Sequence, residues 1–176
     1  MRPPIAHLSI HLLLACTVTI PARAQNWQIV GSAGFTADTA FNTSLATAPN
    51  GDLHLAYVDY ANARKASVIR FDGTNWVPVG TPGFSAGQVY GTCMAFSPSG
   101  EPYVAYNDYV NNDRGTVKKF DGSAWVTVGM EGFTFTTMPH RASLAISNSG
   151  VPYVAYTDLF PTNAVVVMKF DGTDFK

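Results

Sequence analysis

The chain has 176 residues, of which 47% are hydrophobic, 12% aromatic and only 13% charged, and its formal net charge is −1. Without Arg2 and Arg23, which lie in a predicted leader, nine basic side chains face twelve acidic ones, a net charge near −3. This balance argues against nucleic acid and anionic membrane surfaces as partners, because both are bound through an excess of basic side chains.

Residues 1–24 are predicted to be a secretory signal peptide. Arg2 gives a basic start, a mostly apolar run extends over residues 5–20, and the Ala-Arg-Ala at 22–24 has the small residues of a cleavage site. The apolar run contains two histidines and is short for a membrane span, so no membrane insertion is expected after cleavage. We therefore expect a secreted, periplasmic or cell-surface protein.

A lipid anchor is the alternative to simple cleavage. The Leu-Leu-Ala-Cys at 13–16 resembles a bacterial lipobox, which would attach a lipid to Cys16. We favour cleavage because the signal-peptide pattern is complete and no polar tether follows Cys16. Cys93 is then the one cysteine of the mature chain. An intramolecular disulfide is therefore excluded, and we expect the Cys93 thiol to be buried and inert.

The mature chain repeats itself with a period of 49 residues. Trp27, Trp76 and Trp125 are each followed by Val-Gly after two residues, then by Gly-Phe, Ala-Tyr-x-Asp and, in register, Phe-Asp-Gly. The third unit carries one inserted residue, and Phe175 stands at the next tryptophan position. Units of this length stack in tandem, because one unit cannot bury its apolar face alone. The units are predicted at 32–80, 81–129 and 130–176, after a lone outer strand at 25–31.

Each unit predicts four β-strands, because short apolar runs alternate with clusters of Gly, Asn, Asp and Pro. The fourth strand begins at the tryptophan, after an Asp-Gly pair that strongly indicates a hairpin turn. The other strands are predicted at 44–47, 53–58 and 66–71 in the first unit, at 92–96, 103–107 and 116–120 in the second, and at 143–146, 153–157 and 165–170 in the third.

Several of these strands are apolar on both faces, such as Tyr-Val-Ala-Tyr at 103–106 and Val-Val-Val-Met at 165–168. Strands of this kind belong to sheets that are covered on both sides. A four-stranded sheet with a neighbour on each face is a propeller blade. We therefore predict an all-β fold with about three four-stranded antiparallel blades of a β-propeller, either as an open arc or as part of a larger closed propeller.

The Gly-x-Pro-Tyr-Val-Ala-Tyr-x-Asp and Phe-Asp-Gly-x-x-Trp strings resemble the tandem repeats of secreted bacterial β-propeller proteins. The turn is similar to the Asp-box hairpin of sialidase-like propellers, although it lacks the serine-x-aspartate opening. The resemblance covers the mature chain and implies a fold rather than an activity. Because propellers usually have four to eight blades, we expect an N-terminal fragment of a longer protein. A ring of copies is the alternative, and the exposed blade faces predict self-association.

Candidate binding residues gather on one rim of the predicted blades. Each second strand ends in an aspartate, and the following loops emerge on the same face as the connections between blades. A ring of carboxylates suits a sugar, a cation or a peptide, whereas the alternative is that each aspartate caps its own loop. Residues that break the repeat are better candidates, because the fold does not require them. The candidates are Asp59, Asp108, Asp158, Arg64, Arg114, His140 and Arg141.

The sequence predicts no catalytic set and no cofactor. It has no His and Cys cluster with zinc spacing, and Glu101 and Glu131 do not form the carboxylate pair of a glycosidase. Residues 111–113, Asn-Asn-Asp, offer oxygen atoms for Ca²⁺ beside Asp108, but their spacing fits no standard calcium loop. We predict an exported non-catalytic module that binds a glycan or a protein on its rim. The alternatives are part of a secreted sialidase-like glycosidase or lyase, and a structural repeat of a surface protein.

Overall fold

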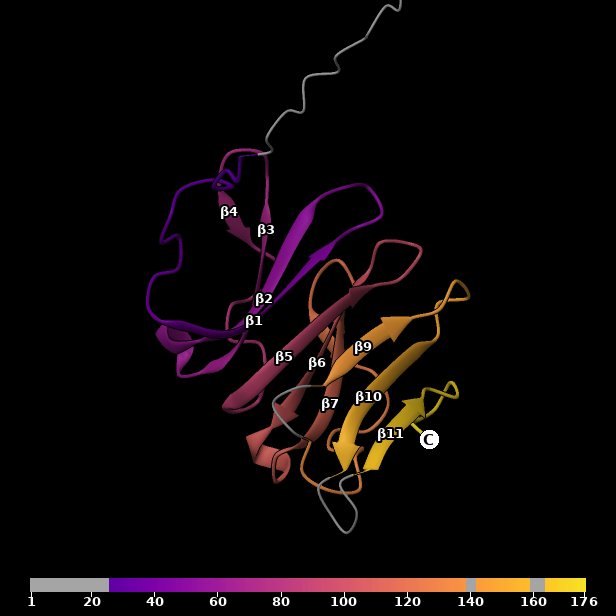
Figure 1. The fold of residues 1–176 in the computed structure, drawn as a ribbon. Helices are drawn as coiled ribbons and strands as arrows, with labels where there is room; N and C mark the ends of the chain where they lie inside the picture. The colour runs from indigo at the N-terminus through magenta and orange to yellow at the C-terminus, as the bar shows by residue number, and fades with distance from the viewer. Residues whose placement is uncertain (1–25, 139–141, 159–163) are drawn as a thin grey trace, which may run out of the picture.

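The computed structural model describes residues 26–138, 142–158 and 164–176. They form three antiparallel sheets that follow one another along the chain (Figure 1). The predicted signal peptide, Cys16 and two site candidates, His140 and Arg141, lie outside the described residues. None of the described segments forms a helix with the length and apolar character needed to cross a membrane.

All three sheets are meanders, in which each strand pairs with the next along the chain. The first sheet contains β1 (Ala40–Thr47), β2 (Leu53–Asp59), β3 (Lys65–Phe71) and β4 (Trp76–Pro78). The second contains β5 (Val89–Phe96), β6 (Pro102–Asp108), β7 (Arg114–Phe120) and β8 (Trp125–Thr127). The third contains β9 (Ser143–Ile146), β10 (Pro152–Asp158) and β11 (Ala164–Lys169). Short 3₁₀ turns, η1 (Tyr60–Asn62) and η2 (Tyr109–Asn111), follow β2 and β6.

The predicted all-β fold is confirmed, with one difference in the third sheet. There the fourth strand is reduced to a single bridge between Phe170 and Phe175. In all three sheets the Asp-Gly turn is stabilised by its own aspartate. The Asp121 carboxylate accepts hydrogen bonds from the backbone amides of Ala124 and Ser123, both at 2.8 Å, which lowers the pKa of Asp121 to about 2.

Two predicted boundaries are wrong. The first strands begin at Ala40 and Val89, earlier than predicted, because a β-bulge lets each of them continue pairing with the second strand. The lone strand predicted at 25–31 is not formed over 26–31, and Trp27 is fully exposed. A fourth strand pairs with the third strand of its own sheet, and no described strand precedes residues 26–31 to play that part.

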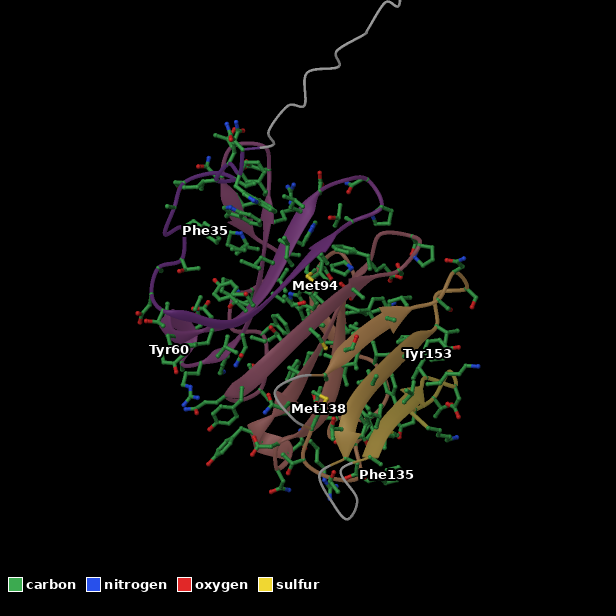
Figure 2. All side chains as sticks on the ribbon, in the orientation of Figure 1. Phe35, Tyr60, Met94, Phe135, Met138 and Tyr153 are labelled. Atoms are coloured by element: carbon green, nitrogen blue, oxygen red, sulfur yellow. The ribbon has the colours of Figure 1, made fainter. Side chains whose placement is uncertain are left out.

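The sheets pack face to face, with β1, β5 and β9 side by side as the innermost strands (Figure 1). Met94 on β5 belongs to one buried cluster with Ala56 and Val68 of the first sheet. Leu144 on β9 belongs to a second cluster with Val117 of the second sheet. Figure 2 shows Met94 and, lower in the view, Met138. These clusters are the hydrophobic core, and they explain why strands are apolar on both faces.

The connection between two sheets also packs on the later sheet. Phe84, in the connection from β4 to β5, stacks on Trp125 with ring centroids 4.3 Å apart. The Trp125 indole also donates a 2.9 Å hydrogen bond to the carbonyl oxygen of Val79. Similar stacking joins Phe35 to Trp76 and Phe133 to Phe175. The repeated Gly-Phe and Trp therefore serve the packing of sheet on sheet.

Candidate functional site

The loops after β2 and β6, with the connections between sheets, form one rim of the molecule. The aspartates at the strand ends turn inward at this rim. The Asp59 carboxylate is buried and accepts hydrogen bonds from Ser67 Oγ at 2.7 Å and Asn62 Nδ2 at 2.8 Å. Asp108 is 0% exposed and accepts from Asn111 Nδ2, Thr116 Oγ1 and the Val110 amide at 2.9 to 3.1 Å. Both carboxylates stabilise their own loops.

The third aspartate of the set is less deeply placed. Asp158 is half-buried and accepts a 2.6 Å hydrogen bond from Thr136 Oγ1. The structure therefore places Asp59, Asp108 and Asp158 at equivalent strand ends but engages each of them in internal hydrogen bonds. Direct contact between these carboxylates and a ligand stays a prediction.

The two described arginines of the predicted set occupy different places in the repeat. Arg64 follows η1, and the residue 49 positions later is Asp113. Arg114 instead opens β7, is exposed, and corresponds to Lys65 of the first sheet. Only Arg64 therefore stands where the second unit carries a residue of opposite charge.

The backbone of Arg64 is held in an unusual conformation. Its φ is +60°, in the left-handed region that asparagine and aspartate visit more readily than other non-glycine residues. The second unit has Asn112 and Asp113 at φ of 57° and 58°, whereas the first has Ala63 and Arg64. The Arg64 amide donates to the Asp59 carbonyl oxygen at 2.8 Å. An arginine here is not explained by backbone preference, which points to a role for its side chain.

The Arg64 side chain lies between two tyrosine rings. Its guanidinium carbon is 4.6 Å from the centre of the Tyr90 ring on β5 and 5.4 Å from that of Tyr60 on η1. Both distances lie within the range of cation–π attraction. The Arg64 Nε is buried without a hydrogen-bond partner among the described residues. A buried donor left unpaired is costly, so this atom is a candidate contact for a ligand.

A pocket of about 200 Å³ opens beside this stack. Further aromatic rings lie on both sides of Arg64. The ring centroids of Phe41 and Tyr60 are 5.3 Å apart, and those of Tyr109 and Tyr90 are 6.2 Å apart. We call the row formed by these four rings and Arg64 the aromatic rim. Its pocket is lined by Phe41, Asn42, Val58, Tyr60, Arg64, Val89 and Tyr90.

Sequence reasoning named only Arg64 of these residues. A usable signal was nevertheless present, because aromatic residues recur here at the 49-residue spacing, with Phe41 followed by Tyr90 and Tyr60 by Tyr109. Tyr60 and Tyr90 come from different sheets, so only the packing of the sheets brings their rings to the same arginine.

A bound Ca²⁺ at the run from 111 to 113 stays a prediction. Asn111 turns its amide nitrogen, a donor, toward Asp108, and Asn112 caps η2. Asp113 Oδ1 is buried and has no hydrogen-bond partner within the described ranges. Over the described ranges, no three His, Cys, Asp or Glu side chains are grouped closely enough to hold a metal ion.

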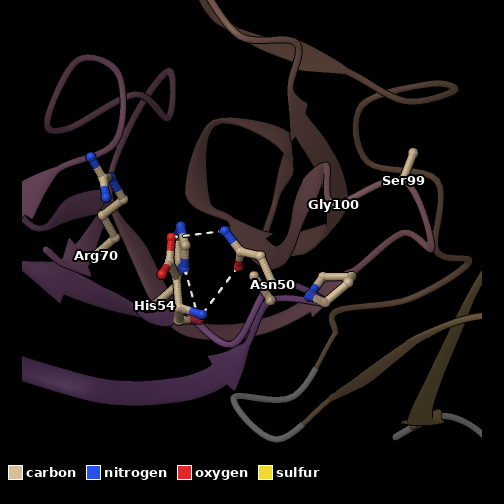
Figure 3. Close-up of a pocket in the computed structure, with 8 residues that line it drawn as sticks. Asn50, His54, Arg70, Ser99 and Gly100 are labelled. Carbon is tan, nitrogen blue, oxygen red and sulfur yellow. Dashed lines mark hydrogen bonds between the residues drawn. The ribbon is translucent and has the colours of Figure 1, made fainter. Parts of the chain in front are cut away.

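A second pocket, of about 320 Å³, lies on the opposite side, between the β1–β2 and β5–β6 turns (Figure 3). His54 and Arg70 line it together with Asn50 and Asp52, which hydrogen-bond to each other. His54 is 7% exposed and meets the Phe96 ring edge-on, with centroids 4.8 Å apart. Burial lowers the pKa of His54, against the opposing effect of the Asp52 carbonyl.

This lowered pKa predicts a pH dependence of stability. The buried imidazole resists protonation in the folded state, so its contribution to stability is complete above the usual pKa of about 6.5 and is lost as the pH falls below it. His54→Tyr keeps an aromatic ring, as in Tyr103 and Tyr153 at the same register. The free energy of unfolding of the wild type should fall faster than that of His54→Tyr between about pH 6.5 and pH 5. Urea denaturation at each pH measures this. If the free energy of unfolding falls equally with pH in both proteins, the assignment to His54 is wrong.

The thiol of Cys93 is expected to be unreactive. Its Sγ lies 3.6 Å from the Ala105 carbonyl oxygen, and burial raises the pKa of Cys93 to about 12. It forms no disulfide within the part of the chain that the structure describes. A thiol with so high a pKa is a weak nucleophile at neutral pH.

Neither protein-family models nor curated proteins match this chain. Solved structures do. An α-L-arabinanase from Penicillium chrysogenum, complexed with arabinobiose, matches 84% of this chain and 50% of its own at 15% identity, with a TM-score of 0.57. A fucose lectin from Kordia zhangzhouensis, in complex with methyl-fucoside, matches 77% of this chain and 96% of its own at 14% identity, with a TM-score of 0.50.

A protein of unknown function from Dyadobacter fermentans matches 76% of this chain and 38% of its own at 15% identity, with a TM-score of 0.53. The chain thus spans half or less of the arabinanase and of the Dyadobacter protein, and nearly all of the lectin. At these identities the likeness concerns the fold alone. The three sheets of this chain are blades of a β-propeller.

Proposed function

We propose that this chain is an exported glycan-binding module whose ligand occupies the pocket of the aromatic rim. The observation that carries the proposal is the Arg64 guanidinium between Tyr60 and Tyr90, with a buried and unpaired Nε beside an open pocket. Binding pockets combine apolar and aromatic walls with a few placed polar groups. Two solved structures of similar fold, the arabinanase and the lectin, hold sugars.

The stack restricts which ligand groups the arginine can meet. The guanidinium carbon lies 4.6 Å and 5.4 Å from the centres of two tyrosine rings, and a planar guanidinium presents its hydrogen-bond donors along its edge. A carboxylate is planar and accepts two parallel hydrogen bonds from such an edge. The ligand group that fits best is therefore the carboxylate of an acidic sugar, such as a uronic acid.

The rest of the pocket suits the body of a sugar ring. Phe41 is 51% exposed and Tyr60 is 36% exposed, so both rings offer apolar area at the surface. Asn42 lines the same pocket and donates through its side chain to the Tyr90 carbonyl oxygen. Aromatic rings pack on the apolar C–H face of a sugar, and polar groups at their edges take its hydroxyls.

Binding in this pocket requires no catalytic group. The buried carboxylates nearest to it, those of Asp59 and Asp108, are occupied by internal hydrogen bonds. Their assigned task is to shape the loops that carry the aromatic rings. Turnover of a uronic-acid oligosaccharide by the chain would instead favour the alternative of a glycosidase or lyase.

Replacement of Arg64 tests the proposal. Arg64→Ala should weaken binding of a uronic-acid oligosaccharide about 30-fold or more, because the charge-assisted pair with the carboxylate is lost. Arg64→Lys should recover little, since an ammonium group cannot form the two parallel hydrogen bonds. Affinities measured by isothermal titration calorimetry would give both numbers.

The matched control is Arg70→Ala, which removes an arginine from the pocket on the other side of the molecule and should leave the affinity unchanged. A neutral oligosaccharide of the same size separates two outcomes. If it binds as tightly as the acidic one and Arg64→Ala still weakens both, the glycan site stands but the acidic sugar is wrong. If Arg64→Ala and Arg70→Ala bind as the wild type does, the site itself is wrong.

A further inference from the structure

Among the described residues, nothing covers one apolar face of the first sheet and one of the third, and we propose that these faces join two copies of this chain head to tail into a closed ring. We call the face that a sheet turns toward the preceding sheet its leading face, and the face turned toward the following sheet its trailing face. The two internal junctions of the chain, between the first and second and between the second and third sheets, are the pattern for the proposed contact.

On the leading faces, one apolar position is buried wherever a preceding sheet covers it. Met94 and Leu144 occupy the same register on β5 and β9 and are 7% and 8% exposed, because the preceding sheet covers each of them. Leu45 has this register on β1 and is 62% exposed. The first sheet therefore presents to solvent the side chain that the other two sheets bury.

The trailing faces show the complementary half of the junction. Val68 on β3 and Val117 on β7 are 2% and 0% exposed, because the following sheet covers them. Val167 on β11 has the same register and is 62% exposed, and its neighbour Val165 is 75% exposed. Exposed apolar area of this kind, rimmed by polar residues, is typical of a protein interface. Figure 2 labels Phe35, in the segment before the first sheet, and Tyr153 on the third sheet, at opposite ends of the row of sheets.

The two internal junctions share a hydrogen bond, and both of its partners are also present at the equivalent positions of the uncovered faces. Ser85 Oγ accepts a 3.0 Å hydrogen bond from the Ala66 amide, across the first junction. Thr134 Oγ1 does the same for the Gly115 amide, across the second. The hydroxyl at this register before the first sheet is Thr36, and the amide at this register in the third sheet belongs to Val165. The proposed junction pairs these two groups.

A second polar contact follows the same rule. The Met94 amide on β5 donates to Ser44 Oγ on β1 at 3.0 Å. The residue with the register of Ser44 in the third sheet is Ser143, which is exposed, and the residue with the register of Met94 in the first sheet is Leu45. Both polar partners are thus present on faces that are otherwise apolar, which favours a copy of this chain over an unrelated partner.

The number of copies follows from the number of sheets. A contact between the trailing face of one copy and the leading face of the next is heterologous, so it closes only at a fixed number of sheets. The described residues of one copy form three sheets, and the proposal takes these three as its share of the ring. Two copies give a ring of six, within the range of about four to eight found for propellers, whereas three copies would exceed it. The expected assembly is a dimer.

Charged substitutions on the two faces test this assembly. The chain without its predicted leader should have a mass near twice that of one copy in size-exclusion chromatography with light scattering. Val167→Lys and Leu45→Glu should each yield monomers, with dimerisation weakened about 100-fold because an unpaired charge would be buried. Mixing these two variants should restore a dimer, since one of its junctions pairs the new lysine with the new glutamate. Val110→Lys is the control, because Val110 is 59% exposed but lies on η2, away from both faces.

The other outcomes overturn the proposal. A monomeric wild type means that something else, such as further sheets of a longer chain, covers these faces. A dimer that only one of the two substitutions disrupts pairs like faces instead of unlike ones. A ladder of larger species shows that the contact does not close into a ring of two. Circular dichroism of each variant establishes that loss of the dimer is not loss of the fold.

Discussion

Trp125→Ala should lower the free energy of unfolding by about 2 kcal/mol, because a large, partly buried aromatic side chain that packs on the core is removed. The Trp125 ring stacks on Phe84 and leans on Phe120 at 5.6 Å. Its indole N–H also ties β8 to Val79 at the end of the first sheet. The substitution therefore removes a contact of the core and a contact between sheets at the same time. Urea denaturation followed by circular dichroism measures the change.

The repeat supplies its own control for this experiment. Trp27 occupies the same register as Trp125 but is fully exposed, so Trp27→Ala should change the free energy of unfolding by no more than about 0.5 kcal/mol. The sequence alone predicts the same contribution to stability from both tryptophans, because they occupy equivalent positions in the repeat. Equal losses from both substitutions would contradict the packing described for residues 26–31.

Asp108→Ala is expected to be the second severe substitution, with a loss of about 3 kcal/mol. Asp108 is 0% exposed, and three donors would lose their acceptor: the Val110 amide, Asn111 Nδ2 and the hydroxyl of the buried Thr116. Hydrogen bonds to a charged group contribute about 1.5–3 kcal/mol each, and buried donors without partners are costly. Thermal and urea unfolding would measure the loss.

Asp158→Ala is the matched control, because Asp158 is half-buried and accepts its described hydrogen bond from Thr136. Its loss should be smaller, about 1 kcal/mol. The pair of variants also separates two roles for the rim aspartates. If Asp108→Ala leaves stability unchanged and abolishes glycan binding, the carboxylate is a ligand contact and its assignment to the loop is wrong.

The architecture could be predicted because short sequence patterns that determine local structure recur in each unit. Each tryptophan unit ends in an Asp-Gly turn, and the strands between such turns are apolar on both faces, which together predict stacked meanders. These sequence patterns fail to predict a strand correctly where its formation depends on a second strand beside it. The stretch beginning at Trp27 has the composition of a fourth strand, yet the described part of the chain offers residues 26–31 no third strand to pair with, and they form no sheet there.

The binding pocket could be predicted only in part. Arg64 stood out because it breaks the repeat, but a loop arginine has no defined neighbours until the sheets are packed. The tyrosine that stacks on it most closely, Tyr90, is 26 residues away on β5 of the next sheet. The rim aspartates illustrate the converse. Their recurrence resembles a designed ring of ligands, whereas Asp59 and Asp108 are buried and hydrogen-bonded within their own loops.

The most direct test of the rim pocket is an NMR titration that observes the Arg64 Nε–H group, assigned by its absence in Arg64→Lys. The Nε atom is buried and has no partner among the described residues, and Arg64 lines the pocket. A uronic-acid oligosaccharide should shift its signal strongly downfield, as a proton moves when it enters a charge-assisted hydrogen bond, while the neutral counterpart leaves it in place. An Arg64 signal that stays fixed while the acidic sugar perturbs amides elsewhere would contradict the assignment of this pocket.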